Sequence, residues 1–301
     1  MLGLKQGDEM RGFKLWLTGL LVVASWGLTW HRTAPAQSPA ARETYAELPG
    51  ARIWYKDTGG DGVPVVFLHA ATGSNRNWEY QIPAFVGAGF RFIAYDRRGW
   101  GRSVIDPAGK QPGTGADDLQ SLMDHLRMDR FHLVGTAAGA FVALDYALSY
   151  PERLRSLVIA NSVGGVQDED FLELGRRIRP SPQFEGLPPD VRELGPSYRA
   201  ANPEGTRRWI ELEHLSRPQG AQAPAQTMRH RLTFSLLETI NVPTLLLTGD
   251  ADLFAPPPVL KLFADRIQGA ESLIVPEAGH STYWEKPDIF NRAVLDFVRK
   301  H

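Results

Sequence analysis

From residue 51 onward, short apolar runs alternate along the chain with segments of helical periodicity. VPVVFLHA (63–70) and FRFIAYD (90–96) are nearly uninterrupted apolar runs, which is typical of strands buried on both faces of a sheet. In DDLQSLMDHL (117–126) the apolar residues recur at helical spacing. The same criteria predict further strands at 131–135, 154–161, 242–252 and 272–280, and further helices near 77–88, 140–148, 256–267 and 289–301. This alternation predicts an α/β fold with a mostly parallel central sheet and helices on both of its faces.

Two stretches depart from this rhythm. Residues 37–49 begin rich in Ala, Pro, Gln and Ser and suggest a disordered linker, so that ARIWYKDTG (51–59) becomes the predicted edge strand. Residues 164–236 hold charged helical pieces, Pro/Gly breaks and no convincing strand. We interpret 164–236 as a helical cap, inserted between a first core part (37–163) and a second (237–301).

The N-terminal segment differs from the rest of the chain, because it contains a long stretch of uncharged, mostly apolar residues. The stretch from Leu15 to Trp30 carries no charge, basic residues precede it, and the small-x-small sequence at 34–36 follows it. This pattern predicts a signal peptide over residues 1–36 and a periplasmic or secreted protein. An uncleaved membrane anchor is the alternative, although the apolar stretch is shorter than the ~20 residues that span a bilayer. Membrane contact is expected only through this segment.

The amino-acid composition and the spacing of residues limit the classes of partner and cofactor that the protein can bind. The formal net charge is −1 and the basic residues form no stripe, which argues against nucleic acid as a partner. The chain has no cysteine, so disulfides, catalytic thiols and thiolate metal sites are excluded. No His/Asp/Glu cluster has metal-ligand spacing, and no phosphate loop or dinucleotide fingerprint follows the first strand. We therefore expect neither a metal nor a cofactor.

FHLVGTAAGAFVALD (131–145) has the form of a nucleophile elbow. An apolar strand enters a Gly-x-x-x-Gly turn and leaves as an apolar helix, which is the G-x-S-x-G pattern of a sharp turn that exposes a serine. Gly135 and Gly139 are present, but the central residue is Ala137. Thr136 is no substitute, because a neighbouring position on such a turn points elsewhere.

An acid and a histidine follow in the expected chain order. Asp252 lies in GDAD after the 242–252 strand signal, and His280 lies in EAGH after that of 272–280. Either residue alone is as often a helix cap or a structural residue. Their joint occurrence after an elbow predicts a catalytic pair. Asp250 competes for the acid role, and Asp252 fits the spacing better.

Two backbone amides are expected to form an oxyanion hole. One is that of Ala138, the residue after the nucleophile position. The other is assigned to Ala71 in HAATG (69–73), since backbone donors do not depend on side-chain identity. His69 is expected to be structural.

Other aromatic and histidine residues weigh less. Trp78, Trp100 and Trp284 flank the predicted loops, and we expect them to belong to the core, as aromatic residues more often do, with pocket lining as the alternative. His214 and His230 lie among charges and are expected to be solvated.

Together, HAATG, YDRRGWGRS (95–103), GTAAG, GDAD and GH resemble the α/β-hydrolase family over about residues 45–300. The tail GHSTYWEKPDIFNRAVLDFV and the helical cap resemble esterases and the carbon–carbon-bond hydrolases that cleave ring-fission products. The resemblance implies a small organic ester, lactone or C–C substrate bound between core and cap.

The missing hydroxyl leaves three readings open. The chain is a serine hydrolase whose serine was replaced by alanine, or an enzyme in which His280 and Asp252 act as a general-base pair without a covalent intermediate, or a non-catalytic small-molecule-binding protein. We rank the His-base enzyme first, because His280 and Asp252 are both kept in context.

Overall fold

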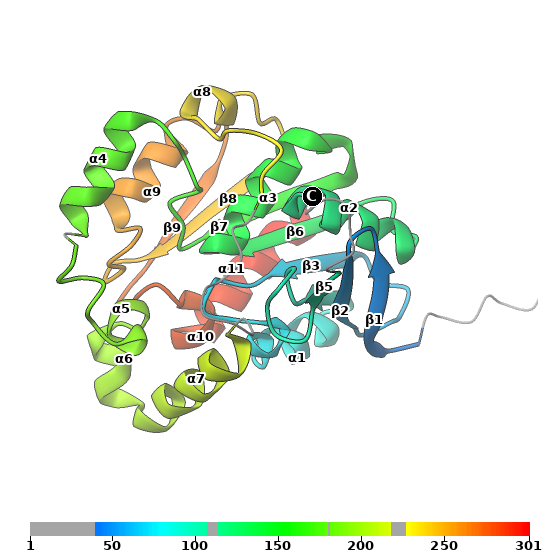
Figure 1. Ribbon diagram of the computed structural model, residues 1–301, viewed down its shortest axis with the longest axis horizontal. Coiled ribbons are helices and arrows are strands. Elements are labelled where there is room, and N and C mark those ends of the chain that lie inside the picture. Colours follow the sequence, from blue (N-terminus) through cyan, green and yellow to red (C-terminus); the bar gives the residue numbers. More distant parts are fainter. Residues whose placement is uncertain (1–39, 107–112, 180, 218–226) are drawn as a thin grey trace, which may run out of the picture. The chain divides into compact units, whose positions relative to one another are not determined.

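The computed structural model describes residues 40–106, 113–179, 181–217 and 227–301. In these residues the chain forms one nine-stranded sheet (Figure 1). Its order is β1 (Arg42–Leu48), β2 (Ala51–Asp57), β4 (Arg91–Tyr95), β3 (Pro64–Leu68), β6 (Phe131–Thr136), β7 (Leu154–Ala160), β8 (Thr244–Gly249) and β9 (Glu271–Val275), and β5 (Val104–Ile105) pairs with β2. From β4 through β9 all neighbours are parallel, and β2 is antiparallel to its partners. The predicted fold class is confirmed.

Helices cover both faces of the sheet (Figure 1). They are α1 (Gln81–Gly87), α2 (Gly115–His125), α3 (Ala138–Ser149), α9 (Pro257–Ala264), α10 (Thr282–Glu285) and α11 (Pro287–Lys300), with 3-10 turns at Asn75–Trp78 and Pro151–Arg153. Strand β3 shows why both faces are covered. Val66 and Leu68 pack into one hydrophobic cluster, whereas Val65 and Phe67 pack into the other. Successive side chains of a strand point to opposite faces, so an apolar run needs a helical layer on each side.

The expected linker and edge strand are wrong. Residues 42–48 form β1, whose Tyr45 packs edge-on against Trp54 of β2 at 4.7 Å between ring centroids. Strand β2 is therefore internal, with β1 on one side and β4 on the other. The Ala/Pro-rich composition belongs to residues before β1, and averaging over 37–49 concealed a strand of which only Ala46 is fully buried.

The segment predicted as a cap, 164–236, contains five helices and no strand in its described residues. They are α4 (Glu169–Ile178), α5 (Pro189–Glu193), α6 (Pro196–Ala201), α7 (Pro203–Ser216) and α8 (Phe234–Leu237). Phe171 of α4 and Phe234 of α8 pack against Phe263 of α9, and Trp209 of α7 lies in the cluster on the other face of the sheet. The segment thus packs directly on the core, and its boundaries as a domain stay a prediction.

The predicted signal peptide, residues 1–36, lies outside the described residues. Within the described part, no helix has both the length and the apolar character needed to cross a membrane.

Candidate active site

Strand β6 passes into α3 through Ala137, whose backbone has φ 48° and ψ −117°. A positive φ is unfavourable for alanine because its Cβ approaches the backbone. Two hydrogen bonds hold the turn: the amide of Ala137 donates to the carbonyl of Ala160 at 2.9 Å, and the Ser162 hydroxyl donates to the carbonyl of Ala137 at 2.8 Å. The strained elbow is therefore present without a serine.

Gly139 sets how closely α3 approaches β3. A Cβ at this position would lie 2.3 Å from the carbonyl oxygen of Leu68. Only glycine allows this contact, which brings the start of α3 beside the loop that follows β3.

The loop after β3 is braced by side chains. The Trp100 indole donates to the carbonyl of Ala71 at 2.8 Å. His69 accepts the Arg97 amide at Nε2 (2.9 Å), which places its proton on Nδ1, 2.6 Å from the carbonyl of Ala70. Burial, together with the charge of Arg97, holds the pKa of His69 well below its usual value. His69 is therefore a neutral structural residue, as expected.

The amides assigned to the oxyanion hole are available. Among the described residues, no hydrogen-bond acceptor is found for the backbone N–H of Ala71 or Ala138. The Ala138 amide belongs to the first turn of α3, where N–H groups have no partner within the helix. Both amides can donate to an oxyanion.

Asp252 follows β8 and is buried. Its carboxylate accepts the amides of Phe254 (2.8 Å) and Ala255 (2.9 Å) and the side-chain amide of Asn161 (3.1 Å), and it faces His280 Nδ1 at 2.9 Å. Burial alone would raise the pKa of Asp252, but the charge of His280 and these hydrogen bonds lower it below its usual value. Asp252 thus stays ionised.

Asp250, the other candidate for the acid, contacts the backbone of a neighbouring turn instead of His280. It is exposed, and its Oδ1 accepts the amide of Glu277 at 2.7 Å. Asp250 joins the turns after β8 and β9 and does not contact His280 in any hydrogen bond of the described residues.

His280 follows β9, and its ring is buried against Phe254 with 4.4 Å between ring centroids. The bond from Nδ1 to Asp252 fixes the tautomer and leaves Nε2 with its lone pair free to accept a proton. Burial by itself lowers the pKa of His280, but the charge and hydrogen bond of Asp252 outweigh it, and the net pKa is raised. This environment is that of a general base whose protonated form is stabilised.

Two acids that sequence reasoning missed hold the loop of His280. The carboxylate of Glu285 accepts the amides of Gly279 (2.9 Å) and Ser281 (3.2 Å), and the carbonyl of Glu193 accepts the His280 amide at 2.7 Å. A Cβ on Gly279 would lie 2.4 Å from the nitrogen of Gly195, which explains the glycine before the histidine. No motif in the sequence marks Glu193, because its contact with His280 spans 87 residues of chain.

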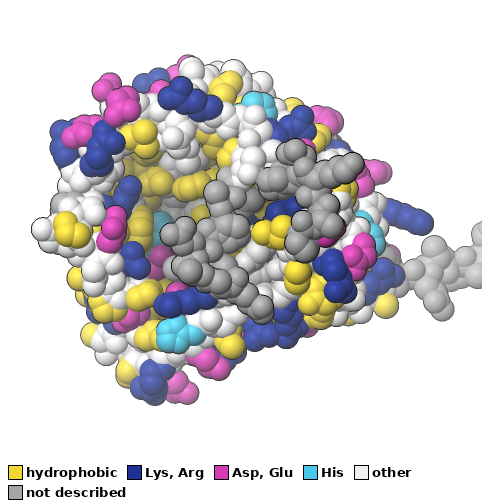
Figure 2. Space-filling view, viewed as in Figure 1, with side chains coloured by type: hydrophobic (Ala, Val, Ile, Leu, Met, Phe, Trp, Pro, Cys, Tyr) yellow, Lys and Arg dark blue, Asp and Glu magenta, His cyan; other side chains and the backbone are white. Residues whose placement is uncertain are grey.

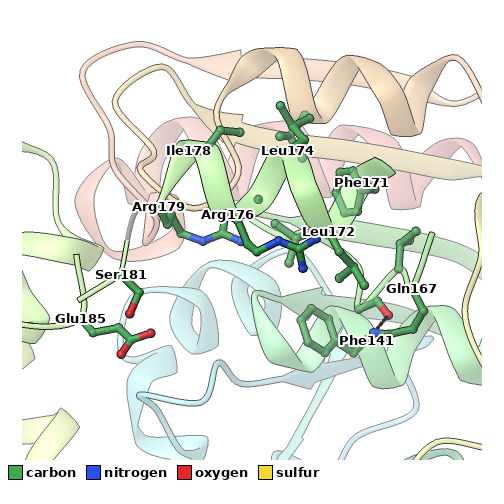
Figure 3. Close-up of a pocket in the computed structure, with 15 residues that line it drawn as sticks. Phe141, Gln167, Phe171, Leu172, Leu174, Arg176, Ile178, Arg179, Ser181 and Glu185 are labelled. Atoms are coloured by element: carbon green, nitrogen blue, oxygen red, sulfur yellow. Dashed lines mark hydrogen bonds between the residues drawn. The ribbon is translucent and has the colours of Figure 1, made fainter. Parts of the chain in front are cut away.

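These elements enclose a cavity of about 160 Å³. The residues that line it come from the loop after β3, from the elbow and α3, from the end of α5, and from the segments that follow β7, β8 and β9. They are Ala70, Ala71, Ala137, Ala138, Phe141, Ser162, Val163, Glu193, Phe254 and His280. The structure thus brings together the predicted site residues around one space, with Asp252 behind His280. Phe141 and Val163 also line a cavity of about 390 Å³ beside α4, so the two spaces adjoin (Figure 3). Figure 2 shows hydrophobic side chains gathered in a hollow beside α4.

A model described as the alpha/beta hydrolase family matches residues 65–293. The chain belongs to the alpha/beta hydrolase family. Its curated relatives include the 2-hydroxy-6-oxononadienedioate/2-hydroxy-6-oxononatrienedioate hydrolase of Burkholderia vietnamiensis, 30% identical over 83% of this chain and 91% of the relative. Another is the 2-hydroxy-6-oxo-6-phenylhexa-2,4-dienoate hydrolase of Comamonas testosteroni, 28% identical over 87% and 96%.

Solved structures agree with this assignment. A thermophilic esterase from Thermogutta terrifontis has a TM-score of 0.70 and 28% identity, over 88% of this chain and 99% of the esterase. The enol-lactonase from Burkholderia xenovorans shares the fold, with a TM-score of 0.66 at 22% identity over 85% and 99%. The relatives of this alpha/beta hydrolase are therefore named hydrolases of the same superfamily.

The remaining predicted residues of this alpha/beta hydrolase divide in two groups. Trp78 and Trp284 are fully buried in the core, and the His214 side chain is 62% exposed, as expected. The expectation for His230 is wrong: its Nδ1 lies 2.8 Å from the carboxylate of Asp145, a fully buried acid on α3. A buried carboxylate needs partners, and the segment at 229–230 supplies them. Among the described residues, no group of three or more His, Asp or Glu is placed to hold a metal ion.

Proposed function

We propose that this alpha/beta hydrolase cleaves a small organic ester, lactone or carbon–carbon substrate without a covalent enzyme intermediate. His280, oriented by Asp252, acts as the general base, and the amides of Ala71 and Ala138 bind the developing oxyanion. One observation carries the proposal: His280 and both amides line the same cavity, and the methyl group of Ala137 forms its wall where a serine would attack.

Hydrolysis of an ester would proceed in two stages. Nε2 of His280 takes a proton from water, the water oxygen bonds to the carbonyl carbon, and the carbonyl electrons form the oxyanion. Collapse of the oxyanion breaks the bond to the alcohol oxygen, which takes up a proton, and the imidazolium loses the proton that it took from water. Ester and water become acid and alcohol. A positioned base contributes about 10²–10⁴ in rate and each oxyanion donor about 10²–10³, so catalysis does not require the serine.

The adjoining cavity supplies room for the part of the substrate that does not react. Phe141 of α3 and Leu172 of α4 line it, together with Arg176 and Arg179 (Figure 3). We propose that the apolar body of the substrate binds here, between the core and the predicted cap. The named relatives, hydrolases of ring-fission products and an esterase, support a substrate of this size and character.

The test is a panel of short-chain esters, lactones and 2-hydroxy-6-oxo-dienoates with wild-type protein and His280→Ala. We expect the substitution to lower kcat/KM by about 10²–10⁴-fold on the substrate that is turned over. His214→Ala, which removes an exposed imidazole, should leave activity unchanged. Activity that survives in His280→Ala would eliminate the base mechanism. Tight binding of an apolar ligand without turnover of any substrate class would instead indicate a non-catalytic binding protein.

We also propose that residues 1–36 direct export and are removed. Support comes from the sequence pattern of this segment. N-terminal sequencing of the protein from the periplasmic fraction should then begin near Gln37. A full-length N-terminus recovered with membranes would show an anchor instead.

A further inference from the structure

Glu193 is an acid in the site that the mechanism above does not use. It ends α5, lines the 160 Å³ cavity together with His280 and Ala137, and is only 7% exposed. Its Oε2 atom is buried, with no hydrogen-bond partner among the described residues. A buried polar atom without a partner is destabilising, and such atoms are rare unless a ligand or water completes their hydrogen bonds.

The backbone of Glu193 is held close to that of His280. Its carbonyl accepts the His280 amide at 2.7 Å, and Gly195, two residues later, donates to the carboxylate of Glu285 at 2.7 Å. The segment is therefore tied to the loop of His280 at two points. These bonds keep both residues at the wall of the same cavity.

The charges around Glu193 suit it to hold a proton. Burial and, to a smaller extent, the carboxylates of Asp252 and Glu213 raise the pKa of Glu193, the charges of His280 and Arg192 oppose them, and the resulting pKa is about 7. The pKa of His280 is raised in turn, in part by the charge of Glu193. The charge state of each group therefore influences the protonation of the other.

We propose that Glu193 is the proton donor of this site, delivering its carboxyl proton to the leaving group after His280 has removed a proton from water. The inference rests on the proposed function and adds a second group to it. The departing alkoxide takes the Glu193 proton, and the His280 imidazolium holds the proton from water. Transfer of that proton back to the Glu193 carboxylate, directly or through solvent, restores both groups. Ester and water still give acid and alcohol.

The absence of a serine makes a separate donor useful. In a serine hydrolase one imidazole serves as base in the first half of the reaction and as acid towards the leaving group. When water attacks directly, His280 takes up the proton of that water, and the oxyanion that forms must then expel the alkoxide. A carboxylic acid on another wall of the cavity can give this alkoxide its proton as the oxyanion collapses.

The test compares two esters that share an acyl group and differ in leaving group, one an alkyl alcohol and the other p-nitrophenol. With Glu193→Gln, kcat/KM for the alkyl ester should fall about 10²-fold or more, while the nitrophenyl ester should lose less than about tenfold, because nitrophenolate leaves without a proton. Glu211→Gln removes an exposed carboxyl on α7 and serves as the matched control, with both rates unchanged. Equal losses on both esters would show a positioning role only and overturn the proposal.

The pH profile supplies a readout that packing alone would not move. Glu193 is active as an acid, so the wild-type rate on the alkyl ester should decline as pH rises through about 7. In Glu193→Gln this alkaline limb should disappear. An alkaline limb that persists unchanged would assign it to another group.

An NMR titration separates this inference from the proposed function. Loss of the Glu193 charge should move the titration midpoint of the His280 ring to lower pH in Glu193→Gln. A midpoint that does not move overturns the role of Glu193, whether or not the protein turns over a substrate. Wild-type protein that is inert towards every substrate class overturns the proposed function, and a shifted midpoint in that protein would still support proton exchange between Glu193 and His280.

Discussion

The two halves of the site differ in what the chain retains. In the acid–base half, side chain and backbone are both complete: His280 faces Asp252 at 2.9 Å, and the imidazole ring and the carboxylate are both buried. In the elbow half the backbone alone is complete. Ala137 has a positive φ, and the Ala138 amide has no acceptor among the described residues, but the side chain at 137 carries no hydroxyl.

This difference shows what maintains an elbow. A backbone held in a sparsely populated conformation costs about 1–3 kcal/mol and persists only where the surroundings enforce it. Here the enforcing contacts are the close approach at Gly139 and the hydrogen bonds of Ala137 to Ala160 and Ser162. None of them involves the side chain at 137, so the geometry does not depend on which side chain stands there.

The strongest way to remove the difference is Ala137→Ser, which restores a hydroxyl to the elbow. We expect stoichiometric labelling by a fluorophosphonate and burst kinetics with short-chain aryl esters. The gain in rate can approach about 10⁶-fold, the factor lost when such a serine is removed. The measurements are intact-mass analysis and stopped-flow absorbance.

The control for this gain is Ala138→Ser, which places a hydroxyl one residue later, on α3, and should not become labelled. If Ala137→Ser folds but stays inert and unlabelled, His280 and the elbow are not aligned. The chain would then not be a serine hydrolase disabled at one residue.

The substitution Asp252→Asn weakens the acid–base half of the site. The amide cannot stabilise the imidazolium, and kcat/KM should fall about 10²–10⁴-fold. The charge of Asp252 raises the pKa of His280, and the neutral imidazole is the active form, so the wild-type rate falls as pH drops through a value above 6.5. In Asp252→Asn this acid limb should move to lower pH. A limb at the same pH in both proteins would show that His280 is not the base.

The smallest effect concerns the strain itself. Ala137→Gly should stabilise the protein by about 1 kcal/mol, because glycine adopts a positive φ without the Cβ clash. Ala84→Gly, in the regular helix α1, should destabilise by about 0.5–1 kcal/mol. Urea unfolding of both variants gives the comparison. A loss of stability in Ala137→Gly would mean that the elbow is not strained.

The prediction from sequence succeeded where a signal is local. The strands β3, β4, β6, β7 and β8 are mostly apolar, and the Gly-x-x-x-Gly turn carries its own steric requirement, so strands and elbow could be located from the letters. It failed at β1, because most residues of this strand are exposed, only Ala46 is fully buried, and no apolar run marks it before it pairs with β2. It failed at His230 as well, because the partner Asp145 lies 85 residues away.

The amino-acid sequence by itself determined the α/β alternation, the order of elbow, acid and histidine, and the missing hydroxyl at Ala137, because each depends on neighbours in the chain. Only the tertiary structure decided between Asp250 and Asp252 and brought Glu193 into the cavity. Which buried carboxyl faces an imidazole depends on how distant loops meet at the carboxyl edge of the sheet. No pattern of neighbouring residues in the sequence indicates which distant loops come together there.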